Sequence, residues 1–233
     1  AARRGIPATI VMPRTSRGKK IDAVREFGGK IVFCEPTLAA RETMARQIVS
    51  ETGAVFIHPY DNDHIIAGQG TAALELGQAV PSLEHVITPI GGGGLISGTA
   101  IATRAWGVSV FGVEPAGAAD TLESLQQGEV VASARPDTIA DGLRAIVGQR
   151  NFRVIRDHVK QVLIVDDEEI RTAMMRSWQS LKLLIEPSSA TVIAAITRYP
   201  ELFRGRKVGA IISGGNIHPA DWCALTRSDP ASN

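Results

Sequence analysis

The stretch His85-Val86-Ile87-Thr88-Pro89-Ile90-Gly91-Gly92-Gly93-Gly94-Leu95-Ile96-Ser97-Gly98 joins an apolar run to a helical pattern through four consecutive glycines. Glycine has no Cβ that would hold a ligand away from the backbone N–H groups, and the following helix adds its positive dipole end. The stretch therefore predicts a strand–loop–helix junction that binds a phosphate; a plain glycine-rich turn is the alternative. It is not a dinucleotide fingerprint, because Ser97 stands where the last glycine would be, and no P-loop lysine follows.

Short runs rich in valine and isoleucine alternate with helical patterns along the whole chain. The predicted strands cover residues 9–12, 31–34, 54–57, 85–90, 108–113, 161–165 and 208–212, and two of the helical patterns cover residues 38–51 and 166–184. This alternation predicts an α/β fold in which helices flank parallel sheets. Turn-forming residues cluster in Pro59-Tyr60-Asp61-Asn62-Asp63, so we place a domain boundary there, between residues 1–62 and residues 63–233.

Composition narrows the class of protein. A chain of 233 residues with 44% hydrophobic content can bury the core of one or two domains, and a net charge of +1 argues against a nucleic-acid partner. No apolar stretch approaches the roughly 20 residues that span a bilayer, so we expect a cytoplasmic protein without a membrane partner. Two distant cysteines favour buried, reduced thiols over a disulfide, and the five histidines share no metal-ligand spacing.

Two further motifs accompany the glycines. Residues 208–212 run into Ser213-Gly214-Gly215-Asn216, and Glu186 directly precedes Pro187. In this order and spacing, the three motifs resemble the fold-type II pyridoxal-phosphate enzymes (tryptophan synthase β-like), in the branch of threonine dehydratase (ammonia-lyase) and serine racemase. The resemblance covers essentially the whole chain. It implies that residues 1–62 belong to a small domain and residues 63–233 to a large cofactor-binding domain.

The resemblance also implies a site for pyridoxal 5'-phosphate. The residues that would contact the cofactor are Gly91, Gly92, Gly93, Gly94, Leu95, Gly142, Glu186 and Ser213. Ser213 would hydrogen-bond the pyridine nitrogen. Because a hydroxyl, unlike an aspartate, does not hold that nitrogen protonated, we expect prompt β-elimination rather than a long-lived carbanion. Each of these residues also has a simpler interpretation. Ser213 could cap a turn, Glu186 could pair with a cation or cap the following helix, and Gly142 could be an ordinary turn glycine.

A third group of residues suggests a cation site. Glu114 and Asp120 flank a glycine-containing loop, and carboxylate and carbonyl oxygens suit Mg²⁺ or Ca²⁺. The resemblance implies that these two acids and the carbonyl of Ala118 hold the ion. The alternative is that Asp120 is the N-cap of a helix with Glu123 at its third position.

The chain shows no motif for the lysine that holds the cofactor as a Schiff base. Its lysines are Lys19, Lys20, Lys30, Lys160, Lys182 and Lys207, and their settings suggest solvated faces. Residues 1–5 read as the last turn of a helix that ends at Gly5. We therefore expect an N-terminally truncated fragment in which both domains are incomplete at their N-terminal side and which is inactive by itself.

For the intact protein, the resemblance implies a pyridoxal-phosphate-dependent ammonia-lyase that converts L-threonine or L-serine into a 2-oxo acid and ammonia, with a homo-oligomeric state expected. Serine racemisation and hydroxyaspartate dehydration are alternatives on the same scaffold. Tyr60 favours the dehydratases, because eukaryotic serine racemases tend to carry asparagine there and bacterial dehydratases an aromatic residue. A hypothesis of another class is that the chain is a catalytically inactive fragment that binds phosphate or metal.

Overall fold

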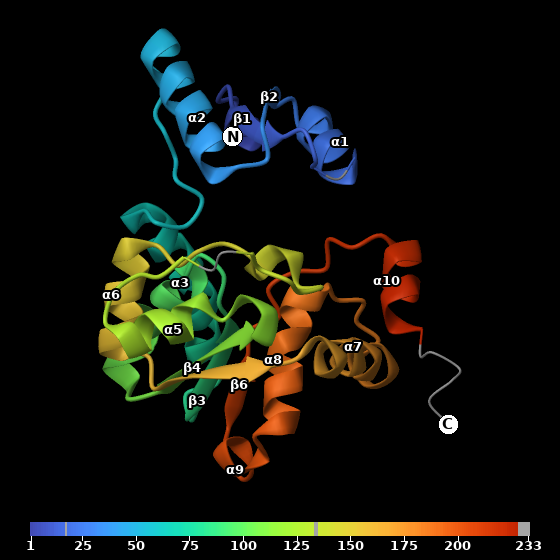
Figure 1. Ribbon diagram of the computed structural model, residues 1–233. Coiled ribbons are helices and arrows are strands. Elements are labelled where there is room, and N and C mark those ends of the chain that lie inside the picture. Colours follow the sequence, from blue (N-terminus) through green and yellow to red (C-terminus); the bar gives the residue numbers. More distant parts are fainter. Residues whose placement is uncertain (17, 133–134, 228–233) are drawn as a thin grey trace. The chain divides into compact units, whose positions relative to one another are not determined.

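The computed structural model describes residues 1–16, 18–132 and 135–227. The chain divides into two compact units, Ala1–Ile57 and His58–Asn233, and each contains its own parallel sheet (Figure 1). The division falls a few residues before the boundary expected after residue 62. The assignment of the units as the small and large domains of a known fold stays a prediction.

The first unit contains two parallel strands, β1 (Thr9–Pro13) and β2 (Lys30–Cys34), connected through helix α1 (Gly18–Glu26). Helix α2 (Leu38–Thr52) follows and ends at Gly53 in the left-handed conformation, with φ 68°. The chain opens with a short 3-10 turn, Ala2–Arg4, that ends at a left-handed Gly5, as the sequence predicts for a helix end. Residues 54–57 form no strand, contrary to the prediction: no neighbouring strand pairs with them, and Val55 is 83% exposed.

The second unit contains a sheet of four strands in the order β5-β4-β3-β6, and every neighbouring pair is parallel. The strands are β3 (His85–Pro89), β4 (Ser109–Pro115), β5 (Gln161–Val165) and β6 (Val208–Ala210). All four coincide with predicted strands. The expected α/β class, with parallel sheets flanked by helices, is therefore confirmed.

The helices of the second unit are α3 (Asp63–Ala79), α4 (Gly94–Thr103), α5 (Asp120–Gln127), α6 (Gln149–His158), α7 (Asp167–Arg176), α8 (Pro187–Arg198), α9 (Pro200–Phe203) and α10 (Pro219–Thr226). The long helix predicted over residues 166–184 is shorter than expected. It leaves α-geometry after Arg176, continues as a π-helical turn over Ser177–Leu181 and stops at Lys182, whose φ is 58°.

Alternating side chains of the second sheet build a hydrophobic cluster on each of its faces, because successive residues of a strand point to opposite sides. Val110 packs with Ile96 of α4 and Ile155 of α6. Its neighbour Phe111 belongs to a separate cluster that includes Met174 of α7. Helices α4 and α6 thus cover one face and α7 and α8 the other, which leaves the strand ends free to carry functional loops (Figure 1).

Two further observations concern the helices and the cysteines. Among the described residues, none of the helices has the length and apolar character needed to cross a bilayer. Cys34 is buried in β2 as expected, but Cys223 of α10 is exposed, so the expectation of a buried thiol is wrong for that residue.

Helices α3 and α4 approach each other through two glycines. A Cβ built on Gly98 of α4 would stand 2.3 Å from the carbonyl oxygen of Ile66 and 2.5 Å from the backbone nitrogen of Gly70, both in α3. Backbone atoms cannot give way as a flexible side chain can. Glycine at position 98 therefore sets how closely α3 lies against the helix that follows the tetraglycine segment (residues 91–94).

We expect Gly98→Ala to lower the free energy of unfolding by about 1–3 kcal/mol, because the steric clash outweighs the better helix propensity of alanine. Gly68→Ala is the matched control: it lies in α3, its added Cβ would meet nothing within 4 Å, and it should stabilise by about 0.5–1 kcal/mol. Urea denaturation of both variants measures the two changes. Equal effects would show that the close approach places no constraint on the packing.

Candidate functional site

The residues singled out from the sequence follow the carboxyl ends of the parallel strands. The tetraglycine segment follows β3, Glu114 is the penultimate residue of β4, and Ser213 comes shortly after β6. Parallel strands end at one edge of their sheet, which is where open α/β folds bind ligands. The topology therefore explains how residues far apart in sequence reach the same edge.

The tetraglycine segment forms the predicted loop between β3 and α4. Gly93 is the N-cap of α4 in the left-handed conformation, with φ 90°. Within the described ranges, no hydrogen-bond partner faces the backbone N–H groups of residues 91, 92, 93 and 94. The loop thus presents consecutive unpaired donors at the positive end of a helix dipole, an arrangement that suits an anion.

The side of the loop that faces the protein leaves no room for side chains. A Cβ on Gly92 would stand 2.2 Å from the ring of Tyr60, and one on Gly93 would stand 2.7 Å from Cβ of Asn151. A Cβ on Gly91 would stand 2.9 Å from the carbonyl oxygen of Gly142. The glycines are therefore required by packing as well as by access to the backbone.

Asn151 of α6 holds this loop and was not anticipated from the sequence. Its Nδ2 donates to the carbonyl oxygens of Gly92, at 2.7 Å, and Tyr60, at 3.1 Å, and Gly148 N–H also donates to Gly92 at 3.0 Å. Asn151 is fully buried, and among the described residues its Oδ1 has no partner. An asparagine in the first turn of a helix is too common a pattern to have revealed this role.

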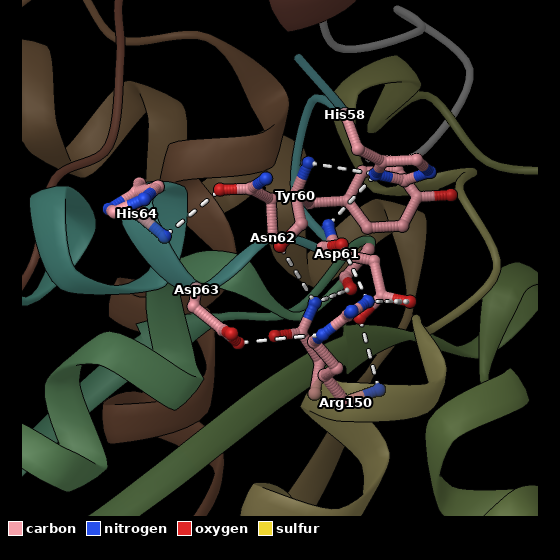
Figure 2. Close-up of polar contacts among 9 residues, drawn as sticks. His58, Tyr60, Asp61, Asn62, Asp63, His64 and Arg150 are labelled. Carbon is pink, nitrogen blue, oxygen red and sulfur yellow. Dashed lines mark hydrogen bonds and ion pairs between the residues drawn. The ribbon is translucent and has the colours of Figure 1, made fainter. Parts of the chain in front are cut away.

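Hydrogen bonds within residues 58–64 and to the start of α6 hold Tyr60 in place (Figure 2). His58 Nδ1 accepts the backbone N–H groups of Tyr60, at 3.3 Å, and Asp61, at 2.9 Å. The rings of His58 and Tyr60 pack edge to face, with their centroids 4.6 Å apart. Nδ1 is therefore the unprotonated nitrogen of the imidazole, since it accepts both bonds.

Arg150 joins the same segment to α6 (Figure 2). Its backbone N–H donates to Asp61 Oδ1 at 3.0 Å, and its guanidinium donates to the Asp61 carbonyl at 3.3 Å and lies 3.5 Å from Asp63 Oδ1. Asn62 Oδ1 caps α3 by accepting the N–H of His64 at 2.9 Å. These local bonds fix where the Tyr60 ring lies over Gly92.

Gly142 lies beside the tetraglycine segment, as the Gly91 contact shows. It sits in a 3-10 turn, Asp141–Leu143, and donates its N–H to Ser188 Oγ of α8 at 3.1 Å. The stretch before it is held by Asp167 of α7, which accepts Thr138 Oγ1 at 2.6 Å and Ile139 N–H at 2.9 Å. Gly142 is therefore fixed from both sides.

The start of α8 holds the loop that contains Ser213. Glu186 is the N-cap residue, but its side chain does not cap the helix; Oε2 instead accepts the N–H of Asn216 at 3.2 Å. Ser213 Oγ lies 3.1 Å from Ser189 Oγ. The structure thus joins Glu186 to the loop that contains Ser213, and the same helix turn contacts Gly142 through Ser188.

Glu114 and Asp120 form a separate buried pair, and the structure corrects the alternative proposed for them. Helix α5 has Ala119, not Asp120, as its N-cap, and no side chain of its own caps it. Glu114 takes this role instead: its two carboxylate oxygens accept the N–H groups of Thr121 and Leu122, each at 2.9 Å.

Burial dominates the electrostatics of this pair. Glu114 is 1% exposed, and burial raises its pKa from 4.5 to about 7, against the opposing effect of its hydrogen bonds. The charge of Asp120 adds to that rise. Burial also raises the pKa of Asp120, whose Oδ2 accepts Val147 N–H at 3.0 Å. Ala118 is buried nearby in the turn Ala116–Ala118, and no cluster of three acidic, histidine or cysteine ligands occurs among the residues described.

Sequence comparison identifies the family. The sequence profile described as "Pyridoxal-phosphate dependent enzyme" matches residues 1–214. The chain belongs to this family. A beta-hydroxyaspartate dehydratase from Paracoccus denitrificans is 43% identical over 216 residues, which cover 92% of this chain and 69% of that protein.

Solved structures agree with this family assignment. Maize serine racemase superposes with a TM-score of 0.91 at 39% identity, over 96% of this chain and 70% of that one. The processed threonine deaminase isoform 2 of Solanum lycopersicum superposes with a TM-score of 0.89 at 33% identity, over 96% of this chain and 63% of that one. The resemblance inferred from the motifs, and the fold-type II class, are confirmed. The chain spans 63% to 70% of the length of these three proteins.

In this member of the pyridoxal-phosphate dependent enzyme family, the hydrogen bonds of Asn151 to Gly92 and Tyr60 should stabilise the fold around the tetraglycine segment. Asn151→Asp replaces a donor with a charge that faces two carbonyl oxygens, so it should lower the free energy of unfolding more than Asn151→Ala, for which we expect about 1–3 kcal/mol. Arg153→Ala, an exposed change in the same helix, is the control. Chemical denaturation ranks the three variants, and an aspartate variant as stable as wild type would refute the assigned hydrogen bonds.

Proposed function

We propose that the tetraglycine segment (Gly91, Gly92, Gly93 and Gly94) and Leu95 bind the phosphate of pyridoxal 5'-phosphate. The observation that carries this proposal is the run of N–H groups without a partner at the start of α4, within the described part of the chain. Amide donors that converge at a helix N-terminus stabilise a phosphate both by hydrogen bonds and by the dipole. The residues present therefore fit the phosphate of the cofactor that the family uses.

The same proposal places the cofactor ring near Gly142, Glu186 and Ser213. Gly142 packs beside Gly91, and the first turn of α8 connects it to the loop after β6. When bound, the cofactor supplies an electron sink that eases the loss of a proton from Cα of an amino acid. The protein's part is to hold the phosphate at one end and the ring nitrogen at Ser213 Oγ at the other.

For the protein encoded by the whole gene, the reaction that we propose is the ammonia-lyase reaction on L-threonine or L-serine. A Cα proton and the β-hydroxyl leave together as water, and hydrolysis then gives a 2-oxo acid and ammonia. The names of a dehydratase and a threonine deaminase among the relatives support elimination. Serine racemisation and hydroxyaspartate elimination are the alternatives, and both also match the name of a relative.

Tyr60 favours elimination over racemisation within this set. Its ring lies against Gly92, and the bonds around His58, Asp61 and Arg150 keep it there. A rigid aromatic ring at this position covers the loop proposed to hold the phosphate. It stands in place of the smaller, polar asparagine expected at this position in eukaryotic racemases.

The second class of function, binding without catalysis by this chain alone, is supported by where the lysines lie. In the second unit, Lys182 Nζ donates to the carbonyl of Gln179, Lys207 Nζ donates to Ser82 Oγ, and Lys160 Nζ lies over the ring of Phe111. These contacts point the three amines to groups other than the proposed cofactor loops. The side chain of Lys19 lies outside the described residues.

The reaction is tested in the protein encoded by the whole gene, supplied with pyridoxal phosphate and L-serine, L-threonine or L-threo-3-hydroxyaspartate. We expect equal amounts of 2-oxo acid and ammonia from at least one substrate. Ser213→Ala should weaken cofactor binding by about 1–3 kcal/mol, because the proposed hydrogen bond to the ring nitrogen is lost, while the exposed Ser180→Ala should not. Exchange of the Cα hydrogen with solvent deuterium, without 2-oxo acid from any substrate, would instead favour racemisation.

We also propose that Glu114, Asp120 and the carbonyl of Ala118 hold Mg²⁺ or Ca²⁺. Both acids are buried, and neither forms an ion pair with a basic side chain among those described. The raised pKa of Glu114, to about 7, shows how poorly its charge is compensated by the protein alone. Each carboxylate oxygen that accepts one N–H keeps a lone pair for a hard cation.

The cation proposal predicts that Mg²⁺ or Ca²⁺ stabilises the fold by mass action, by about 2.7 kcal/mol at one hundred times the dissociation constant. Glu114→Gln should abolish the rise in thermal midpoint. Glu123→Gln, an exposed change in α5, should retain it. A midpoint that stays constant in millimolar ion for wild-type protein would leave Glu114 solely as the cap of α5.

A further inference from the structure

His58 accepts two backbone hydrogen bonds from residues two and three positions ahead of it (Figure 2). Its Nδ1 receives the N–H of Tyr60 at 3.3 Å and the N–H of Asp61 at 2.9 Å, which closes a tight turn over residues 58–61. An imidazole nitrogen that accepts N–H groups carries no hydrogen of its own. The turn therefore requires the neutral form of His58, in which the hydrogen is on Nε2.

This turn fixes two residues that support the tetraglycine segment. The ring of Tyr60 lies where a side chain of residue 92 would be, and its carbonyl oxygen accepts Asn151 Nδ2 at 3.1 Å. The same Nδ2 donates to the carbonyl oxygen of Gly92 at 2.7 Å. Asp61 lies against Gly148, whose N–H donates to the Gly92 carbonyl at 3.0 Å. Both residues of the turn thus contact groups that hold Gly92 in place.

We propose that His58 is a positioning residue: its neutral form holds Tyr60 against the tetraglycine segment, and its protonation weakens the binding of an anion to that segment. This inference rests on the proposal that the tetraglycine segment binds the phosphate of the cofactor. Protonation puts a hydrogen on Nδ1, which then faces two N–H donors instead of accepting from them. The imidazole must turn away, and residues 58–61 lose both bonds that close the turn.

The affinity of a loop for an anion depends on how well its donors are ordered before binding. When the turn is closed, the loop already has the shape in which its N–H groups converge, and the anion need not order it. When the turn opens, the cost of ordering the loop is subtracted from the affinity. The bonds from Asn151 and Gly148 to Gly92 do not involve His58, so protonation should weaken anion binding without abolishing it.

The charge of a protonated His58 acts in the opposite direction, because a positive charge attracts an anion. The other charged and titratable side chains of the same segment and of the start of α6 are Asp61, Asp63, His64 and Arg150, and both aspartates pair with Arg150. Water and salt screen a charge that is not fully buried, whereas the two hydrogen bonds of the turn are lost outright. The loss of the turn therefore dominates, and anion affinity should fall as the pH falls.

The experiment uses inorganic sulfate, which has the shape of a phosphate group and keeps two negative charges over the range in which histidines titrate, about pH 8 to 5. The 233-residue chain is labelled with ¹⁵N-glycine, so that the amide signals of residues 91–94 report binding at the tetraglycine segment itself. We expect the affinity of wild-type protein for sulfate to fall about 3- to 10-fold between about pH 8 and pH 5.5, the effect of losing about one net hydrogen bond.

Two variants separate the acceptor of His58 from its ring, which packs against Tyr60. His58→Asn keeps an acceptor that can close the same turn but does not titrate; it should bind sulfate like wild type at high pH and lose the fall on acidification. His58→Phe keeps a ring without an acceptor and should bind about 3- to 10-fold more weakly at both pH values. His64→Asn removes an exposed histidine of the same segment and should keep the wild-type pH dependence.

Glu114, with a pKa of about 7, is present in every variant, so the difference between wild type and His58→Asn isolates the effect of His58. An affinity that rises on acidification, or that falls equally in wild type and His58→Asn, would overturn the role of His58. This comparison decides by itself if His58→Phe does not fold. Sulfate that shifts none of the amide signals of residues 91–94 in wild type at high pH would overturn the proposed phosphate site as well.

Discussion

The ring of Tyr60, the side chain of Asn151 and the carbonyl of Gly142 all lie where the tetraglycine segment has no side chain. This close packing is what keeps the loop in one shape, while its N–H groups have no hydrogen-bond partner in the described part of the chain. A residue with a Cβ at position 92 would collide with the ring of Tyr60, whose backbone is held by His58 and Asn151, so no small adjustment could accommodate it. The ability to bind an anion and the restriction to glycine have the same physical origin.

The first turn of α8 extends this order to the other side of the site. Ser188 accepts from Gly142, Ser189 binds both backbone groups of Gly214, and Glu186 accepts from Asn216. The N-cap residue and two serines of the first turn of α8 thus hold two loops that come from different parts of the chain. Their side chains also explain why Glu186 and Ser213 come together although 27 positions separate them in the sequence.

Glu114 shows which of two opposing effects wins in a buried site. Two backbone N–H bonds favour the charged carboxylate, yet burial raises its pKa from 4.5 to about 7. The difference corresponds to about 3 kcal/mol against ionisation, so desolvation, together with the charge of Asp120, exceeds the benefit of the hydrogen bonds. A nearby positive charge would favour the ionised carboxylate, and the proposed cation would supply one.

The sequence by itself determined the features that arise from local patterns. The six strands, the glycine junction before α4 and the order of the three motifs could be read directly, because alternation and glycine chemistry act over a few neighbouring residues. The same local patterns gave wrong predictions where the structure depends on a neighbouring strand or side chain. Residues 54–57 have the composition of a strand but no strand beside them, and Asp120 has the type of an N-cap but Glu114 accepts the N–H groups.

Only the tertiary structure decided which side chains hold the site together. Asn151 reaches Gly92 across 59 positions and Tyr60 across 91, and Ser189 reaches Ser213 across 24. No periodicity links such residues, since their contacts exist only after the parallel sheet has brought the strand ends to one edge. The sequence could therefore identify the loops that face a ligand, whereas the direction of each hydrogen bond behind them depends on the packed fold.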